Sequence, residues 1–207
     1  MSLLSTFRAA LSRPLPGATA HARLFPRVVS MPDVIPEDAR HSAVLALLHG
    51  PEDDLRITLI QRTADRGAHS RQIGLPGGGH EAIDESLLHT AMRETTEELG
   101  LPADSYEVLG ALTKLYIPVS RYWVHPFLAY SATPPQYRPA PDEVAHVLEV
   151  PLAHLLLPDT LIQTDVSSPA MPDVVHHVFA YRLPEGELLW GATAMIVSEV
   201  LAMAGEA

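Results

Sequence analysis

The residues best suited to chemistry lie between positions 74 and 101, where a run of glycines precedes closely spaced charged side chains. Glu94, Glu97 and Glu98 lie within little more than one helical turn, directly after Arg93. At about 100° per residue, a helix would place the three carboxylates on one arc. Like charges at this spacing repel one another, so the arc needs a positive partner. Mg²⁺ suits an open carboxylate patch because it prefers oxygen ligands and retains several waters.

A helix from about residue 85 to 99 is predicted to carry these carboxylates. Asp84 or Ser86 can serve as the N-cap, Gly100 can end the helix, and Pro102 follows it. The predicted apolar stripe consists of Leu88, Met92, Thr95 and Leu99.

The spacing of these residues resembles the signature of the Nudix hydrolases, a family that cleaves nucleoside diphosphates linked to another moiety. The matching pattern is Gly79-x5-Glu85-x7-Arg93-Glu94-Thr95-x-Glu97-Glu98-x-Gly100-Leu101. It departs at Thr95, where the family usually has an aliphatic residue, although a threonine methyl can also pack on the apolar side. The alternative is an ordinary amphipathic helix with a solvated acidic face. We favour the family signature because many positions agree with it at once.

This resemblance implies a site for Mg²⁺ or Mn²⁺ that promotes hydrolysis of a pyrophosphate. Glu94 and Glu98 are expected to be the principal metal ligands, Glu97 a further ligand, and the Gly79 carbonyl an additional one. Arg93 and Glu85 are expected to orient these groups by pairing.

Residues 62–79 are predicted to form a polar loop whose terminal glycines bring backbone groups against a phosphate or metal. The loop resembles the segment before the signature in the coenzyme A pyrophosphatase branch of the Nudix enzymes. The matching residues are Arg62, His69, Gln72, Pro76, Gly77 and Gly78. In that branch the acid before the helix lies one position earlier, which selects Gly78 and Asp84 in place of Gly79 and Glu85. This chain satisfies both registers.

Three positions depart from that branch: Gly67 replaces its usual arginine, Arg71 its glycine and Leu75 its phenylalanine. We predict that substrate binding involves Arg62, His69, Arg71, Gln72, Gly77 and Gly78. Alternatively, Arg62, His69 and Gln72 only brace the loop through hydrogen bonds.

Glu143 lies where Nudix proteins often carry a further acidic group outside the signature. It is a candidate metal ligand or general base, and the alternative is a solvated carboxylate at a strand end. The sequence leaves open whether the base is Glu143 or one of the helix glutamates.

Strands and helices that could position this site follow from the apolar patterns. We predict a hairpin of strands 42–48 and 55–61, followed by strands 106–115 and 124–130, which are joined by a loop over the site. After these we predict a strand and short helix within 142–156, a strand at 175–182 and a closing helix at 190–204. Leu189, Trp190, Gly191, Thr193 and Ala194 resemble the segment that closes coenzyme A pyrophosphatases. The fold class expected is α/β, specifically a Nudix-like α/β/α sandwich with a mixed sheet.

The length of the chain and the positions of its prolines indicate the domain organisation. The chain has 207 residues, of which 47% are hydrophobic, enough for one well-packed domain. Residues 1–41 are predicted to form an N-terminal helix and a proline-punctuated arm, and residues 42–207 a Nudix hydrolase domain. The arm is expected to wrap the core or meet a partner.

Composition limits the partners. The formal net charge of −11 argues against nucleic acid, and no apolar run reaches membrane-spanning length. We expect a small-molecule nucleotide substrate, with a homodimer left open. The absence of cysteine is consistent with a reducing compartment, and we expect a cytoplasmic protein. The first residues lack the continuous apolar region of a signal peptide, while a transit peptide remains an alternative.

The leading functional hypothesis is a metal-dependent hydrolase of coenzyme A or acyl-coenzyme A, giving 3′,5′-ADP and a phosphopantetheine product. One alternative is a Nudix hydrolase of ADP-ribose or another nucleoside diphosphate derivative. A second alternative, from a different class, is a non-catalytic Nudix-fold module that binds nucleotide or protein. Intact Glu94, Glu97 and Glu98 argue against that module, which would have no evident need for a strained acidic cluster.

Overall fold

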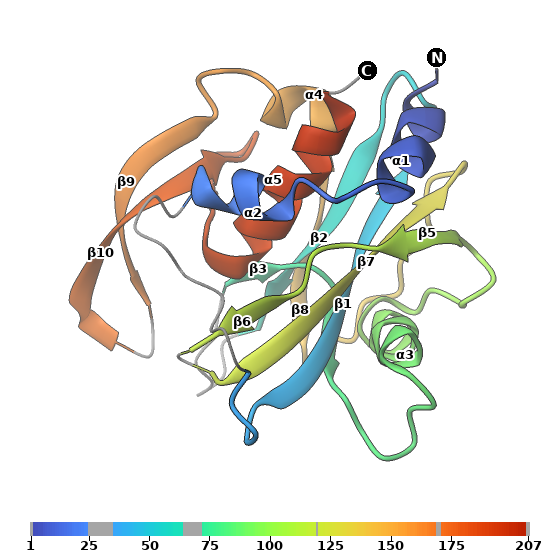
Figure 1. Ribbon diagram of the computed structural model, residues 1–207, viewed down its shortest axis with the longest axis horizontal. Helices are drawn as coiled ribbons and strands as arrows, with labels where there is room; N and C mark the ends of the chain where they lie inside the picture. The colour runs from blue at the N-terminus through green and yellow to red at the C-terminus, as the bar shows by residue number, and fades with distance from the viewer. Residues whose placement is uncertain (1, 25–34, 64–71, 119, 169–170, 206–207) are drawn as a thin grey trace.

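The computed structural model describes residues 2–24, 35–63, 72–118, 120–168 and 171–205. Its centre is an eight-stranded sheet (Figure 1). The strands are β1 (Arg40–His49), β2 (Arg56–Arg62), β3 (Ile73–Gly74), β4 (Gly77–Gly79), β5 (Glu107–Ala111), β6 (Leu115–Ile117), β7 (Tyr122–Ser131) and β8 (Val144–Pro151). The order is β3-β2-β1-β7-β5, with β4 on β1, β6 on β7 and β8 on β2. β1 and β7 are parallel and the other pairs antiparallel, so the predicted mixed sheet is confirmed.

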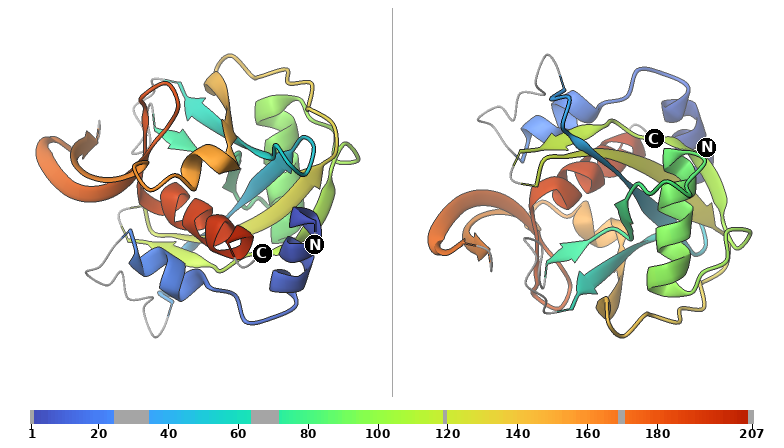
Figure 2. Two further views of the ribbon diagram at one scale, coloured as in Figure 1. Left: turned by 90° about the horizontal axis from the view of Figure 1, so that it is seen from above. Right: turned by 90° about the horizontal axis from the view of Figure 1, so that it is seen from below.

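Helices cover both faces of this sheet (Figures 1 and 2). On one face, Leu45 and Leu47 of β1 belong to the same core cluster as Ala91 and Leu99 of α3 (Leu87–Leu99). On the other face, Leu48 packs in a cluster with residues of α5 (Gly191–Ala204). β1 therefore reads as a continuous apolar run, because both of its faces are buried. These two clusters establish the predicted α/β/α sandwich.

The N-terminal segment packs into the same core. Phe7 of α1 (Leu3–Leu11) is fully buried, and Leu24 is 1% exposed. Between them lies α2 (Gly17–Ala22), whose Ala20 carbonyl accepts a hydrogen bond from Ser198 of α5. The sequence predicted no helix here, because prolines precede it; proline is nevertheless compatible with a helix start. Within the described ranges, no helix has the length and apolar character needed to cross a bilayer.

The C-terminal third adds α4 (Leu152–Leu155) and a second sheet with the order β11-β10-β9. Its strands are β9 (Leu161–Ser168), β10 (Met171–Arg182) and β11 (Leu188–Leu189). β9 and β10 form a long ribbon that extends away from the main sheet (Figure 1). β10, α4 and α5 correspond to predicted elements, whereas β9 and β11, which pair with β10, were not predicted.

Two predicted loops are wrong in part. Gly77–Gly79 form strand β4 against β1, with Ser42 opposite Gly79. Gly77 has φ +148°, and a Cβ there would lie 2.3 Å from the Ala43 carbonyl oxygen. Glycine is therefore required because the two backbones approach too closely for a side chain. Residues 115–117 and 122–124 likewise pair as a hairpin of β6 and β7 in place of the predicted loop over the site.

Candidate active site

The acidic helix α3 begins and ends close to its predicted limits. Ser86 is the N-cap, and its Oγ accepts a hydrogen bond from the His89 amide at 3.1 Å. Gly100, with φ +67°, ends the helix in the left-handed conformation that favours glycine. The packed face differs from the predicted stripe, because Leu87 takes the place of Leu88 in the core cluster.

The three glutamates of α3 have different environments. The side chain of Glu98 is 1% exposed, that of Glu94 is 14% exposed and that of Glu97 is 55% exposed. The carboxylates therefore extend from the interior to the surface, with Glu98 at the base.

Glu98 is held on both oxygens. Its Oε2 accepts a hydrogen bond from the Gly77 amide at 2.8 Å, and its Oε1 accepts one from Arg62 Nη1 at 3.2 Å. Burial raises the pKa of Glu98 to about 7, although both donors oppose the shift, and the charges of Glu94 and Glu143 raise it further. The two hydrogen-bond donors thus offset only part of the cost of burying the charged carboxylate.

Glu94 rests against the backbone of β4. A Cβ at Gly78 would lie 2.4 Å from the Glu94 carboxyl carbon, so a side chain at position 78 would displace this carboxylate. Burial raises the pKa of Glu94, Arg93 lowers it, and the charges of Glu97 and Glu143 add to the increase.

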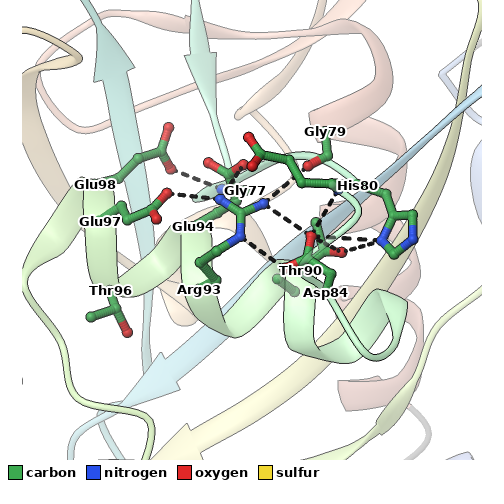
Figure 3. Close-up of polar contacts among 12 residues, drawn as sticks. Gly77, Gly79, His80, Asp84, Thr90, Arg93, Glu94, Thr96, Glu97 and Glu98 are labelled. Atoms are coloured by element: carbon green, nitrogen blue, oxygen red, sulfur yellow. Dashed lines mark hydrogen bonds and ion pairs between the residues drawn. The ribbon is translucent and has the colours of Figure 1, made fainter.

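Arg93 connects the carboxylates to the turn before the helix (Figure 3). Its Nη1 lies 2.8 Å from Glu97 Oε2 and 3.1 Å from Glu94 Oε1. Its Nη2 donates to the Gly79 carbonyl at 3.1 Å, and Nε donates to Asp84 Oδ1 at 2.8 Å. The guanidinium therefore crosslinks four groups through its fixed fork of donors.

Asp84, and not Glu85, is the acid that orients Arg93. Asp84 also accepts Arg93 Nη2 at 3.1 Å, and its carboxylate is fully buried. Hydrogen bonding from Arg93 holds the pKa of Asp84 far below its usual range, and the same bonds raise the pKa of Arg93. Glu85 is exposed, and the ion pairs of Arg93 among the described residues are with Asp84, Glu94 and Glu97, so the expectation that Glu85 pairs with Arg93 is wrong.

Glu143 is brought near this cluster by the chain that follows β7. The amides of Arg138 and Ala140 donate to the carbonyls of Leu99 and Glu98, at 2.7 and 2.9 Å. The Glu143 carbonyl accepts from the Thr63 amide at 2.9 Å. The exposed Glu143 carboxylate is close enough for its charge to raise the pKa of both Glu94 and Glu98.

The residues predicted to bind substrate are distributed as follows. Arg62 is engaged by Glu98, and Gln72 accepts a backbone hydrogen bond from the Arg62 amide at 3.1 Å. Gly77 and Gly78 line the carboxylates as described above. His69 and Arg71 lie outside the described residues, as does the departure at Gly67. The departure at Leu75 is a matter of packing, because Leu75 is a buried core residue.

The donor set matches a hard divalent cation in chemistry. Among the described residues, no group of three or more His, Asp or Glu side chains is already gathered to hold a metal ion. The buried Glu98 and the half-buried Glu94 nevertheless have raised pKa values beside a glycine strand. A divalent cation would relieve their repulsion, and oxygen ligands are those that Mg²⁺ and Mn²⁺ prefer.

Two polar residues near Arg93 were not singled out from the sequence. His80 and Thr90 both contact the Asp84 region (Figure 3). No spacing rule would have identified them, because the turn before the helix brings them together only in three dimensions.

Fold and site together define an α/β/α protein with an acidic, glycine-lined site suited to phosphate chemistry. The family model for the NUDIX domain matches residues 39–171. The chain therefore belongs to the Nudix hydrolase family, pyrophosphohydrolases that act on phosphorus anhydrides of small nucleotide-derived substrates and generally use divalent metal ions.

Similar proteins support this assignment. The chain is 31% identical to "Uncharacterized Nudix hydrolase NudL" of Pectobacterium atrosepticum, over 78% of this chain and 81% of that protein. It is 32% identical to the protein of the same name from Photorhabdus laumondii, over 82% and 87% of the two chains. The crystal structure of a MutT/nudix family protein from Enterococcus faecalis superimposes with a TM-score of 0.53 over 93% of this chain and 71% of that one, at 19% identity. That structural likeness concerns the fold.

Proposed function

We propose that this Nudix hydrolase cleaves the pyrophosphate bond of coenzyme A or acyl-coenzyme A, giving 3′,5′-ADP and a phosphopantetheine product. The observation that supports the proposal is the register of the site. Arg93 pairs with Asp84, and Glu94 rests on Gly78. This is the register of the coenzyme A pyrophosphatase resemblance, in which the acid lies one position before Glu85.

The proposed metal ligands are Glu94, Glu98 and Glu97, with the Gly79 carbonyl as an additional ligand and Mg²⁺ or Mn²⁺ as the ion. When bound, such an ion would neutralise pyrophosphate oxygens and lower the pKa of a water molecule. Arg93 contacts Glu94, Glu97 and the Gly79 carbonyl, so it would fix the orientation of these ligands. Its single charge also limits their mutual repulsion.

In the hydrolysis, a water oxygen bonds to one phosphorus, the bridging P–O bond breaks, and the water gives up a proton. The proton acceptor is either a helix glutamate or Glu143. Glu143 is exposed, whereas Glu94 and Glu98 are not, and it has no place among the proposed principal ligands. Comparing the pH profiles of Glu143→Gln and the parent enzyme distinguishes these choices, since loss of the base removes the acidic limb of the profile.

Substrate choice depends on the ribose 3′-phosphate, which coenzyme A carries and ADP-ribose lacks. Arg62 is a cation close to the Nudix signature, but its guanidinium is paired with Glu98. We therefore expect Arg62→Gln to lower turnover of coenzyme A and dephospho-coenzyme A alike, by roughly 10-fold or more, because a charge-assisted contact is lost. Selective loss of coenzyme A turnover would instead assign Arg62 to the 3′-phosphate.

The test is chromatographic product analysis with coenzyme A, acetyl-coenzyme A, dephospho-coenzyme A and ADP-ribose, with and without Mg²⁺. Metal-dependent formation of 3′,5′-ADP from coenzyme A is expected. Preference for ADP-ribose would favour the alternative Nudix activity, and absence of turnover with all four would favour a binding module. Glu98→Gln is the control for activity that originates elsewhere in the preparation.

We also propose that residues 42–207 form the catalytic domain with residues 1–41 as an appended segment, and that the enzyme acts in the cytoplasm. The shared core of α1, α2 and α5 indicates that this segment stabilises the domain. The absence of cysteine supports a reducing compartment.

A further inference from the structure

A chain of hydrogen bonds extends from Arg93 in the direction away from the glutamates (Figure 3). Asp84 Oδ2 accepts a hydrogen bond from Thr90 Oγ1 at 2.9 Å, in addition to those from Arg93 and the Glu81 amide. Thr90 is fully buried on α3. The Nδ1 atom of His80 lies 2.9 Å from the same Thr90 hydroxyl. The order of the hydrogen bonds is therefore His80, Thr90, Asp84 and Arg93. His80 Nδ1 also lies 3.6 Å from Asp84 Oδ2, which is an ion-pair distance but longer than its contact with Thr90.

The chemistry of the groups sets the direction of these bonds. A carboxylate accepts hydrogen bonds only, so the single hydroxyl proton of Thr90 is directed to Asp84. The hydroxyl oxygen then accepts, and Nδ1 of His80 must carry a proton and donate it. An ionised acceptor makes this hydroxyl bond stronger than the competing contact of Thr90 with the Ser86 carbonyl at 3.3 Å.

His80 is itself fixed in place although its ring is 37% exposed. Its backbone amide donates to the His41 carbonyl at the start of β1, at 3.0 Å. The hydrogen bonds thus connect the central sheet to Arg93 through His80, Thr90 and Asp84.

We propose that His80 and Thr90 are positioning residues for Arg93, and through it for the divalent-metal site of the proposed function on which this inference rests. Thr90 supplies Asp84 with a third donor, which fixes the plane of the carboxylate. That plane sets the direction of the bidentate Arg93 fork, and hence where Nη1 and Nη2 meet Glu97, Glu94 and the Gly79 carbonyl. His80 fixes the direction in which the Thr90 hydroxyl points.

The test is Mn²⁺ binding to the substrate-free protein, measured by calorimetry. Thr90→Val has the shape of threonine but no hydroxyl, and Thr90→Ser retains the hydroxyl. We expect Thr90→Val to raise the Mn²⁺ Kd about 5- to 10-fold and Thr90→Ser to change it less than about 2-fold. Residues that hydrogen-bond directly to metal ligands typically contribute about 10- to 100-fold to metal affinity, and Thr90 contributes less because it acts on the ligands through Asp84 and Arg93.

Two substitutions at His80 provide a second comparison. In His80→Asn the side-chain amide nitrogen falls near the position of Nδ1, so this variant should keep the parent Kd within about 2-fold. In His80→Gln the amide nitrogen extends beyond that position, so this variant should raise the Kd about 3- to 5-fold. His89→Gln is the matched control. His89 is also near Asp84, with 3.9 Å between Nδ1 and Oδ1, but its Nδ1 accepts a hydrogen bond from the Glu85 amide at 3.2 Å.

The double variant Thr90→Val/His80→Gln separates the proposed chain from independent structural effects. If His80 acts through Thr90, the double variant should bind Mn²⁺ as weakly as Thr90→Val alone, within about 2-fold. Multiplied effects, unchanged Kd values in both single variants, or an equal loss in His89→Gln would overturn the proposal. If Thr90→Val does not fold, the three histidine variants decide. Normal Mn²⁺ binding without turnover of coenzyme A in the parent would refute the proposed substrate and leave this inference standing.

Discussion

Replacing Glu98 by glutamine tests the electrostatics of the site in the absence of metal. Glu98 is 1% exposed and has a pKa of about 7, against the ordinary value of 4.5. The folded protein therefore binds this proton more tightly than the unfolded chain does. The resulting stabilisation is fully present below pH 4.5 and is lost as the pH rises through 7.

The magnitude follows from the difference in proton affinity. At about 1.4 kcal/mol for each tenfold difference, the full loss is about 3 kcal/mol, of which roughly 2 to 3 kcal/mol falls between about pH 5 and pH 8. Glutamine has no such proton to lose. The free energy of unfolding of Glu98→Gln relative to the parent should therefore improve by that amount over this range.

Urea denaturation in EDTA at pH 5 and pH 8 measures the difference. Glu97→Gln is the matched control: its side chain is 55% exposed, and its stability relative to the parent should change by less than about 0.5 kcal/mol over the same range. A pH-independent difference between Glu98→Gln and the parent would refute the burial argument. With metal, the same substitution should lower turnover at least about 10²-fold without unfolding the protein.

Three further predictions concern the register and the metal. Asp84→Asn should lower turnover about 10-fold or more because it removes the charge opposite Arg93, while Glu85→Gln should stay within about 2-fold; equal effects would contradict the assigned register. Gly78→Ala should lower turnover roughly 10- to 100-fold by displacing the Glu94 carboxylate, 2.4 Å from the new Cβ. Gly79→Ala should have a smaller effect, because the atom of the described residues nearest to its Cβ, the Tyr122 hydroxyl oxygen, lies at 3.6 Å. Divalent metal should raise the Tm and EDTA should abolish turnover without unfolding, as circular dichroism would show; unfolding on chelation would indicate a structural metal.

Local sequence determined the acidic helix. Ser86 caps the helix and Gly100 ends it. The sequence spacing of Glu94, Glu97 and Glu98 directly sets their relative positions on the helix surface. Helix limits and side-chain spacing depend on neighbours within one or two turns, so they can be predicted without knowledge of the rest of the fold. The apolar run of β1 was equally clear, because burial on both faces leaves no polar alternation. β2 was predicted from its alternating pattern.

Tertiary structure decided which of two adjacent acids serves Arg93. Asp84 and Glu85 both satisfy the spacing, but the turn after β4 buries Asp84 beneath Arg93 and exposes Glu85. Tertiary structure also decided that Gly77–Gly79 form a strand, since only pairing with β1 explains why three glycines are tolerated in a strand. The unequal burial of the three glutamates arises in the same way. Burial and the charge of Glu143, which is distant in sequence, raise the pKa of Glu98, while Gly77 of β4 and Arg62 oppose the increase. Contacts of this kind depend on the packing of remote segments, and no local pattern of residue types encodes them.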